Sequence, residues 1–254
     1  DLDCRITNFT RVIELNATVA EAYFNRGFAY RLKGEHDLAI ADFTKAIELK
    51  PSFDRVYFVR SNIYLRKGVL DLALADINRY LELMPNDAGA IVVRAYTYGR
   101  MGNDDLAIKD LETAIKLYGN SPEASQAYFQ RGKIRCNQGC TDLSLIDYNK
   151  AIQLDPTFAE PYVERGSIHD SKGQFDLAMA DYNKALQLKP NLPRAHNGRG
   201  WIYHQQRLFE QAIAEYTTAI RIDPKYATAY CNRGFAYEEI GEYDLAIADD
   251  TKAL

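Results

Sequence analysis

Arginine and a carboxylate recur together along this sequence, and in every case the acid follows the arginine by 16 residues. The seven arginines are Arg26, Arg60, Arg94, Arg131, Arg165, Arg199 and Arg233, and the acids are Asp42, Asp76, Asp110, Asp147, Asp181, Glu215 and Asp249. A guanidinium and a carboxylate form strong, directional hydrogen bonds, so we expect each arginine to pair with its acid across two neighbouring helices. A catalytic role is not expected, because no catalytic group repeats seven times at one spacing.

Few other residues have the types and spacing of a catalytic or metal site. Cys136 and Cys140 lie four residues apart, but no second cysteine pair accompanies them, and a metal site needs three or four ligands. His196 and His204 are two helical turns apart, which is too far for them to share one metal ion. The sequence also lacks the GxxxxGKS/T, GxSxG and HExxH motifs. We therefore expect free thiols, no metal, no cofactor and no enzymatic activity.

The composition is that of an ordinary globular chain and excludes several classes of function. Of the 254 residues, 47% are hydrophobic and 26% charged, so long disordered segments are not expected. The net charge of −4 argues against a nucleic-acid partner, because phosphate binding needs clustered lysine and arginine. The sequence contains no run of about 18 apolar residues, so we expect no membrane insertion in this segment. The chain opens at Asp1 rather than at methionine, so we expect it to be a segment of a longer protein.

The arginines mark a repeat that organises the whole sequence. Each is followed by a small residue, and successive arginines are 34 residues apart, except for one step of 37. Within a repeat the arginine is at position 7, and glycine is common at position 15. An acid stands at position 18, where the second helix is expected to begin, and proline is common at position 32. These residues predict two helices per repeat, because glycine and proline end helices and an acid stabilises a helix start.

We expect a single solenoid over residues 1–254, in which residues 1–19 form an unpaired second helix. The predicted repeats are residues 20–53, 54–87, 88–124, 125–158, 159–192, 193–226 and 227–254. Each repeat has an apolar face that it cannot bury alone, so neighbouring repeats must stack on one another.

The pattern of small residues and aromatics resembles the tetratricopeptide repeat. Glycine at position 8, tyrosine at 11, alanine at 20 and 27, an aromatic at 24 and proline at 32 carry this resemblance, which is strongest from Ala22 to Pro51. Arginine at position 7 departs from the family, in which leucine is common. The resemblance implies an all-α fold, a right-handed α–α superhelix or solenoid of helix-turn-helix repeats.

The resemblance also implies a concave groove lined by the first helices, mainly by their positions 2, 5, 9 and 12. Position 9 varies widely, and its aromatic, asparagine and lysine side chains are typical of a surface that binds a peptide or a protein segment. Trp201, the only tryptophan, is a candidate anchor. The predicted partner-binding residues are Phe24, Phe28, Arg55, Phe58, Asn62, Tyr96, Phe129, Lys133, Arg194, Asn197, Trp201, His204 and Phe235. Alternatively, Phe24, Phe28 and Phe58 pack against the next repeat.

The leading interpretation is a non-enzymatic scaffold that binds a protein or peptide. Two alternatives are a homo-oligomer, in which solenoids stack end to end, and the regulatory arm of a larger enzyme. The family's chaperone-binding members hold a C-terminal carboxylate with lysine at position 5, but Phe58 stands there beside Asn62, so we reject this role. RNA binding is disfavoured because the inner face mixes acids with bases.

Overall fold

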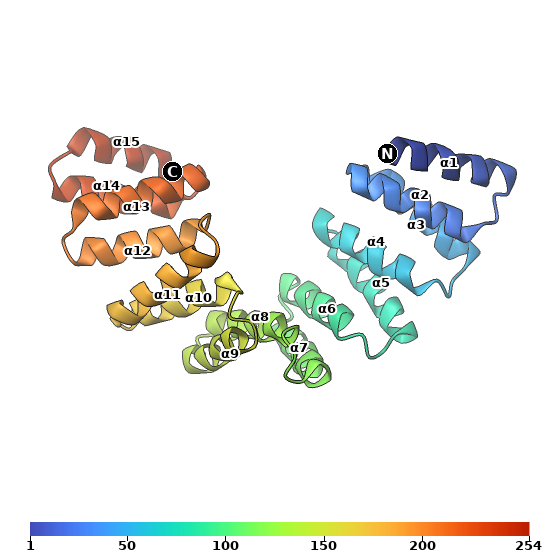
Figure 1. The fold of residues 1–254 in the computed structure, drawn as a ribbon, viewed down its shortest axis with the longest axis horizontal. Coiled ribbons are helices and arrows are strands. Elements are labelled where there is room, and N and C mark those ends of the chain that lie inside the picture. Colours follow the sequence, from blue (N-terminus) through green and yellow to red (C-terminus); the bar gives the residue numbers. More distant parts are fainter. Residues whose placement is uncertain (254) are drawn as a thin grey trace. The chain divides into compact units, whose positions relative to one another are not determined.

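The structure is a computed structural model that describes residues 1–253, and within them every regular element is an α-helix (Figure 1). The fold is therefore all-α, as predicted. The helices are α1 (Leu2–Leu15), α2 (Ala20–Lys33), α3 (His36–Leu49), α4 (Asp54–Lys67), α5 (Leu70–Leu83), α6 (Ala88–Arg100), α7 (Asp104–Tyr118), α8 (Ala124–Asn137), α9 (Thr141–Leu154), α10 (Ala159–Ser171), α11 (Phe175–Leu188), α12 (Pro193–Gln205), α13 (Phe209–Ile222), α14 (Ala227–Glu239) and α15 (Tyr243–Ala253). No helix among these residues has the length and apolarity to cross a bilayer.

The helices form a solenoid of helix-turn-helix repeats, divided into two compact units. The first unit, Asp1–Gly119, holds α1 to α7, and the second, from Asn120 onward, holds α8 to α15. Each first helix packs most extensively against the second helix of its own repeat, as α2 does against α3 and α14 against α15 (Figure 1). Within each unit, the second helix then packs against the first helix of the next repeat, as α3 does against α4 and α11 against α12. Helix α1 packs on α2. The assignment of residues 1–19 to an unpaired second helix and the organisation as one solenoid stay predictions.

The turn inside each repeat requires a left-handed residue, and one repeat supplies it without glycine. Gly34 ends α2 with φ of 82°, a conformation that glycine adopts without steric cost. At the corresponding place in the sixth repeat, Arg207 has φ of 60°, and it is the non-glycine residue with positive φ in the described chain. The turn forms there all the same, because the packed helices on either side force the backbone into it.

Position 8 and position 24 of a repeat complement each other in size. A Cβ atom on Gly132 would lie 2.6 Å from the ring of Tyr148, and one on Gly27 would lie 2.9 Å from the ring of Phe43. In the second repeat position 24 is Ile77 rather than an aromatic, and position 8 is then the buried Ser61. The glycine therefore makes room for the aromatic ring at which the two helices of a repeat meet.

All seven predicted arginine–acid pairs form, which confirms the expectation drawn from the spacing. The shortest oxygen–nitrogen distances lie between 2.6 and 2.8 Å, and the carboxylate side chains are at most 16% exposed. In the fourth repeat Asp147 has no exposed side-chain surface and accepts from both Arg131 and Arg135. Each pair therefore ties the first helix of a repeat to the second.

Six of these arginines also bind the preceding repeat, a contact that our sequence reasoning missed. A further guanidinium nitrogen donates to the side chain at position 25 of the repeat before, over distances of 2.6 to 3.2 Å. The acceptors are Thr10, Thr44, Asn78, Asn149, Asn183 and Thr217. Position 25 holds a side chain with an acceptor oxygen in every repeat, and this regularity was the available signal.

Replacing Asp147 by alanine should lower the free energy of unfolding by about 3–5 kcal/mol, because it removes the carboxylate that two largely buried arginines share. A urea melt followed by circular dichroism measures the loss. The control is Asp142→Ala, which breaks the pair between Lys172 and a carboxylate that is 90% exposed and should change little. Equal melts for wild type and Asp147→Ala would contradict a structural role for the pair.

Replacing Arg207 by glycine should raise the free energy of unfolding by about 1 kcal/mol, because glycine removes the steric cost of a left-handed side chain. Thermal melts of the full chain test this. Gly173→Ala, at the same turn of the fifth repeat where φ is 70°, is the matched reverse change and should lower stability. A destabilised Arg207→Gly would show that the arginine side chain itself holds the turn.

Candidate functional site

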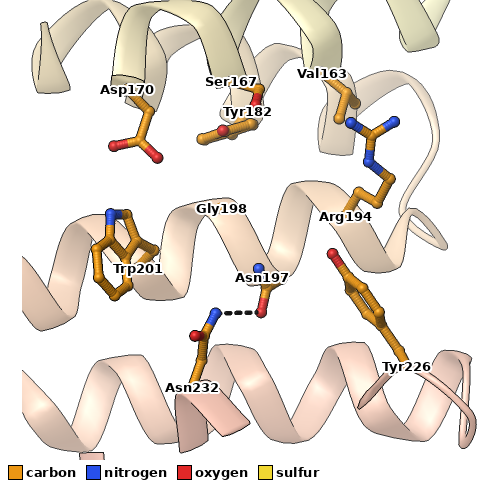
Figure 2. Close-up of a pocket in the computed structure, with 10 residues that line it drawn as sticks. All are labelled: Val163, Ser167, Asp170, Tyr182, Arg194, Asn197, Gly198, Trp201, Tyr226 and Asn232. Atoms are coloured by element: carbon orange, nitrogen blue, oxygen red, sulfur yellow. Dashed lines mark hydrogen bonds between the residues drawn. The ribbon is translucent and has the colours of Figure 1, made fainter. Parts of the chain in front are cut away.

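The first helices of the fifth, sixth and seventh repeats lie side by side, and a pocket opens on the surface they share (Figure 2). Its volume is about 350 Å³, and its walls come from α10, α11, α12 and α14. Helix α12 begins at Pro193, a residue whose fixed φ suits the first turn of a helix. Three of the predicted groove residues, Arg194, Asn197 and Trp201, line this pocket together.

Two polar contacts fix the side of the pocket formed by α12. Arg194 reaches back to α10, where both of its terminal nitrogens donate to the carboxylate of Glu164. This hydrogen bond raises the pKa of Arg194 further, against the opposing effect of burial. On the other side, Asn232 Nδ2 of α14 donates to Asn197 Oδ1 over 3.0 Å (Figure 2). The pocket wall is therefore tied to both neighbouring helices.

A missing side chain at Gly198 makes space for a tyrosine in the pocket. The ring of Tyr182 enters from α11, and a Cβ atom on Gly198 would lie 2.4 Å from its Cζ and 2.7 Å from its hydroxyl. Burial raises the pKa of Tyr182, and the nearby charge of Asp170 adds to the shift. The hydroxyl therefore stays protonated and can donate a hydrogen bond in the pocket.

The opposite end of the pocket combines a carboxylate with an indole. Asp170 of α10 projects towards Trp201 of α12 (Figure 2). Asp170 Oδ1 is buried and has no hydrogen-bond partner in the part of the chain that the structure describes, and burial raises the pKa of this carboxyl. Trp201 stacks on His204 with ring centroids 5.7 Å apart, and His204 in turn meets the edge of Phe209. The indole is therefore held in place by its own helix and by α13.

A second pocket of about 230 Å³ lies in the first unit and includes two other predicted residues, Phe58 and Asn62. Phe58 packs against Tyr80 with ring centroids 5.1 Å apart, and Asn62 Nδ2 donates to the carbonyl oxygen of Phe58. Three basic side chains, Arg31, His36 and Arg66, also line this pocket.

The aromatic residues of α2 combine partial exposure with packing against the next repeat. Phe24 lies 5.1 Å from the ring of Phe53, which precedes α4, and it also packs on Phe28. The guanidinium of Arg55 lies 5.9 Å from the ring of Phe24, and that of Arg31 lies 4.4 Å from the ring of Phe28. The contact between Phe24 and Phe53 is the packing against the next repeat that the alternative interpretation expects. Phe24 and Phe28 are both only half-buried.

The remaining predicted residues divide into exposed and buried side chains. Tyr96 and Phe235 are 45% and 52% exposed, and Lys133 is exposed beside the ring of Phe129. The structure corrects the placement of Phe129 on the exposed groove, because this side chain is only 7% exposed and packs against Tyr148 and Phe158. It belongs to the core of its unit and offers a ligand little surface.

The described residues contain no group of three or more histidine, cysteine or acidic side chains that could hold a metal ion. Cys4, Cys136, Cys140 and Cys231 are free thiols in the described residues.

Family models match most of the chain. A model described as TPR repeat matches residues 166–207 and 208–241, and two models described as tetratricopeptide repeat match residues 20–53 and 92–157. Together these matches cover more than half of the sequence. The chain belongs to the tetratricopeptide repeat family. Proteins of this family are typically non-catalytic interaction scaffolds.

Solved tetratricopeptide repeat structures share this fold. The APC/C hetero-tetramer Cut9-Hcn1 matches 93% of this chain with a TM-score of 0.74 at 16% identity, and the chain spans about half, 46%, of the matched protein. MamA matches 66% of the chain and 96% of its own, with a TM-score of 0.53 at 26% identity. YrrB, titled a TPR protein with an unusual peptide-binding site, matches 74% of the chain and 95% of its own, with a TM-score of 0.57 at 25% identity. A comparison with curated sequences finds no match.

Replacing Gly198 by alanine should lower the free energy of unfolding by roughly 1–3 kcal/mol, because the new methyl group overlaps the buried ring of Tyr182. Denaturant melts measure the change. The control is Gly99→Ala in α6, where nothing lies within 4 Å of the added carbon and alanine should be neutral or stabilising. Similar melts for the two variants would show that the tyrosine ring moves aside without cost.

Proposed function

We propose that this tetratricopeptide repeat protein is a non-catalytic scaffold that binds an extended segment of another protein on the surface formed by α10, α12 and α14. The observation that carries this proposal is the pocket itself, where an aromatic anchor, a pair of amides and a fixed ion pair meet on adjacent first helices. Aromatic residues beside fixed polar groups are typical of surfaces that bind protein segments.

The two amides suit an extended backbone. After Asn232 donates to Asn197, the Nδ2 of Asn197 and the Oδ1 of Asn232 make no further hydrogen bond within residues 1–253. One of these atoms is a donor and the other an acceptor, which is the pairing that a peptide group offers in return. Trp201 beside them provides the apolar surface for a side chain of the bound segment.

The relatives support the same role. YrrB is described by its title as a peptide-binding TPR protein, and it aligns with three quarters of this chain. The repetition of the arginine–acid pair in all seven repeats accounts for these charged groups structurally, so none of them is needed for a reaction. The pocket beside α4 in the first unit, with Phe58 and Asn62 in its wall, is a second surface of the same kind.

Selection of peptides from a phage-displayed library on the immobilised chain tests the proposal. Selected peptides should bind the wild type, and the double variant Asn197→Ala/Trp201→Ala should weaken binding by at least about 30-fold, the loss typical of a hot spot. Fluorescence anisotropy of labelled peptides gives the affinities, and melts verify that the variant remains folded.

The control is Tyr243→Ala, which removes an aromatic side chain that is 65% exposed on the second helix α15. It should leave peptide affinity unchanged. Equal affinity in the wild type and the double variant would place the binding surface elsewhere. Failure to select any peptide, together with light scattering that shows concentration-dependent assembly, would favour the homo-oligomer instead.

A further inference from the structure

The pocket between α10 and α12 contains a carboxylate that lacks a counter-charge. Asp170 Oδ1 is buried and accepts no hydrogen bond within the described residues, and no salt bridge involves Asp170 there. The other acids of this unit that lie in the helix interfaces are matched, as Asp181 is by Arg165 and Glu215 by Arg199. Burying a carboxylate without a cation or a hydrogen-bond donor costs free energy, so a cation that binds beside Asp170 would stabilise it.

The chain does not supply that charge from within the pocket. Arg194 is the basic residue of the lining, and both of its terminal nitrogens are engaged by Glu164. This ion pair balances its own charge and leaves Asp170 as the unbalanced charged group of the wall. The pocket is therefore suited to a cation from outside rather than to an anion.

The surface opposite Asp170 is also of the kind that attracts cations. Figure 2 shows Trp201 across the pocket from the carboxylate, with the nitrogen edge of its indole towards Asp170, and the ring of Tyr182 lies beside Asp170. Aromatic faces, and indole above all, stabilise ammonium and guanidinium groups, most strongly where water is excluded. Stacking on His204 fixes the indole plane, so little side-chain entropy is lost when a ligand binds.

The repeat scaffold does not require an acid at this place. Asp170 is at position 12 of its repeat, where the second repeat has Leu65 and the sixth has His204. Neither helix packing nor the arginine network therefore explains the carboxylate. With a volume of about 350 Å³, the pocket falls within the size range of ligand pockets in proteins.

We propose that this pocket takes a basic side chain, arginine or lysine, of the bound peptide, with its cationic group between the carboxylate of Asp170 and the indole of Trp201. The proposal rests on the proposed function and specifies the class of its ligand. The amides of Asn197 and Asn232 hold the backbone of the same peptide, and Tyr182 closes the floor of the pocket.

A positional-scanning library of acetylated and amidated nonapeptides tests this proposal on the full chain. Each sub-library fixes one residue as arginine, lysine, citrulline, norleucine or glutamate and randomises the others. Binding is measured by anisotropy, and the fluorescence of Trp201, the only tryptophan, reports whether the peptide enters the pocket. At one position, arginine or lysine should bind on the order of tenfold tighter than their neutral counterparts citrulline and norleucine.

The decisive variant is Asp170→Asn, which keeps the shape of the side chain and removes its charge. It should abolish the preference for the basic residue while retaining binding of the citrulline and norleucine peptides. Asp170→Glu should keep the preference in part. Asp142→Asn, at an exposed acid of α9 outside the pocket, is the matched control and should keep it fully.

The possible outcomes separate this subsite from the proposed function. Peptide binding without a charge preference, with a preference for glutamate, or with a basic preference unchanged in Asp170→Asn would overturn the subsite and leave the peptide-binding surface standing. Absence of binding in every sub-library would overturn both. A basic preference that disappears in Asp170→Asn, with a Trp201 fluorescence change in the wild type, would support both.

Discussion

The structure of both units depends on one arginine in each repeat. Its guanidinium binds the acid of its own second helix and, in most repeats, a threonine or asparagine of the repeat before. One side chain thus fixes the angle between two helices and the register between two repeats. Since a buried ion pair contributes more to fixed geometry than to net stability, the apolar stacking supplies the stability and the arginines fix how neighbouring helices are aligned.

Much of the fold could be predicted because the same residue types recur at the same positions of every repeat. A single arginine–acid spacing is weak information, but seven identical spacings identify a contact, and the structure confirms every one. The size relation between positions 8 and 24 was equally visible in the sequence, since every aromatic at position 24 accompanies a glycine at position 8, whereas Ile77 accompanies Ser61. Residues that recur at one position of the repeat make the contacts between helices, so the periodic pattern predicts those contacts.

The pocket could be predicted only in part, because it depends on side chains that do not repeat. The positions of Arg194, Asn197 and Trp201 followed from the resemblance, whereas Tyr182 and Asp170 were missed. Tyr182 is one of the aromatics at position 24 that carry the family resemblance, and it reaches the pocket because Gly198 leaves space. Phe129 fails for the converse reason, since Phe158 covers its ring. The access of Tyr182 to the pocket and the burial of Phe129 both depend on the size of a neighbouring side chain, which the position within the repeat does not specify.

The repeat that provides α12 departs from the repeat pattern but keeps its contacts. His196 replaces the usual tyrosine and bonds both Glu215 and Pro190, so it reproduces the contact that Tyr162 makes with Pro156. Burial of Glu215 is outweighed by hydrogen bonds from His196 and Arg199, and its pKa is lowered. Substitutions that preserve contacts while changing residues are expected where the scaffold must be kept and a surface must change. In residues 193–226 the contacts of the scaffold are thus kept with different residues, in the repeat whose first helix lines the pocket.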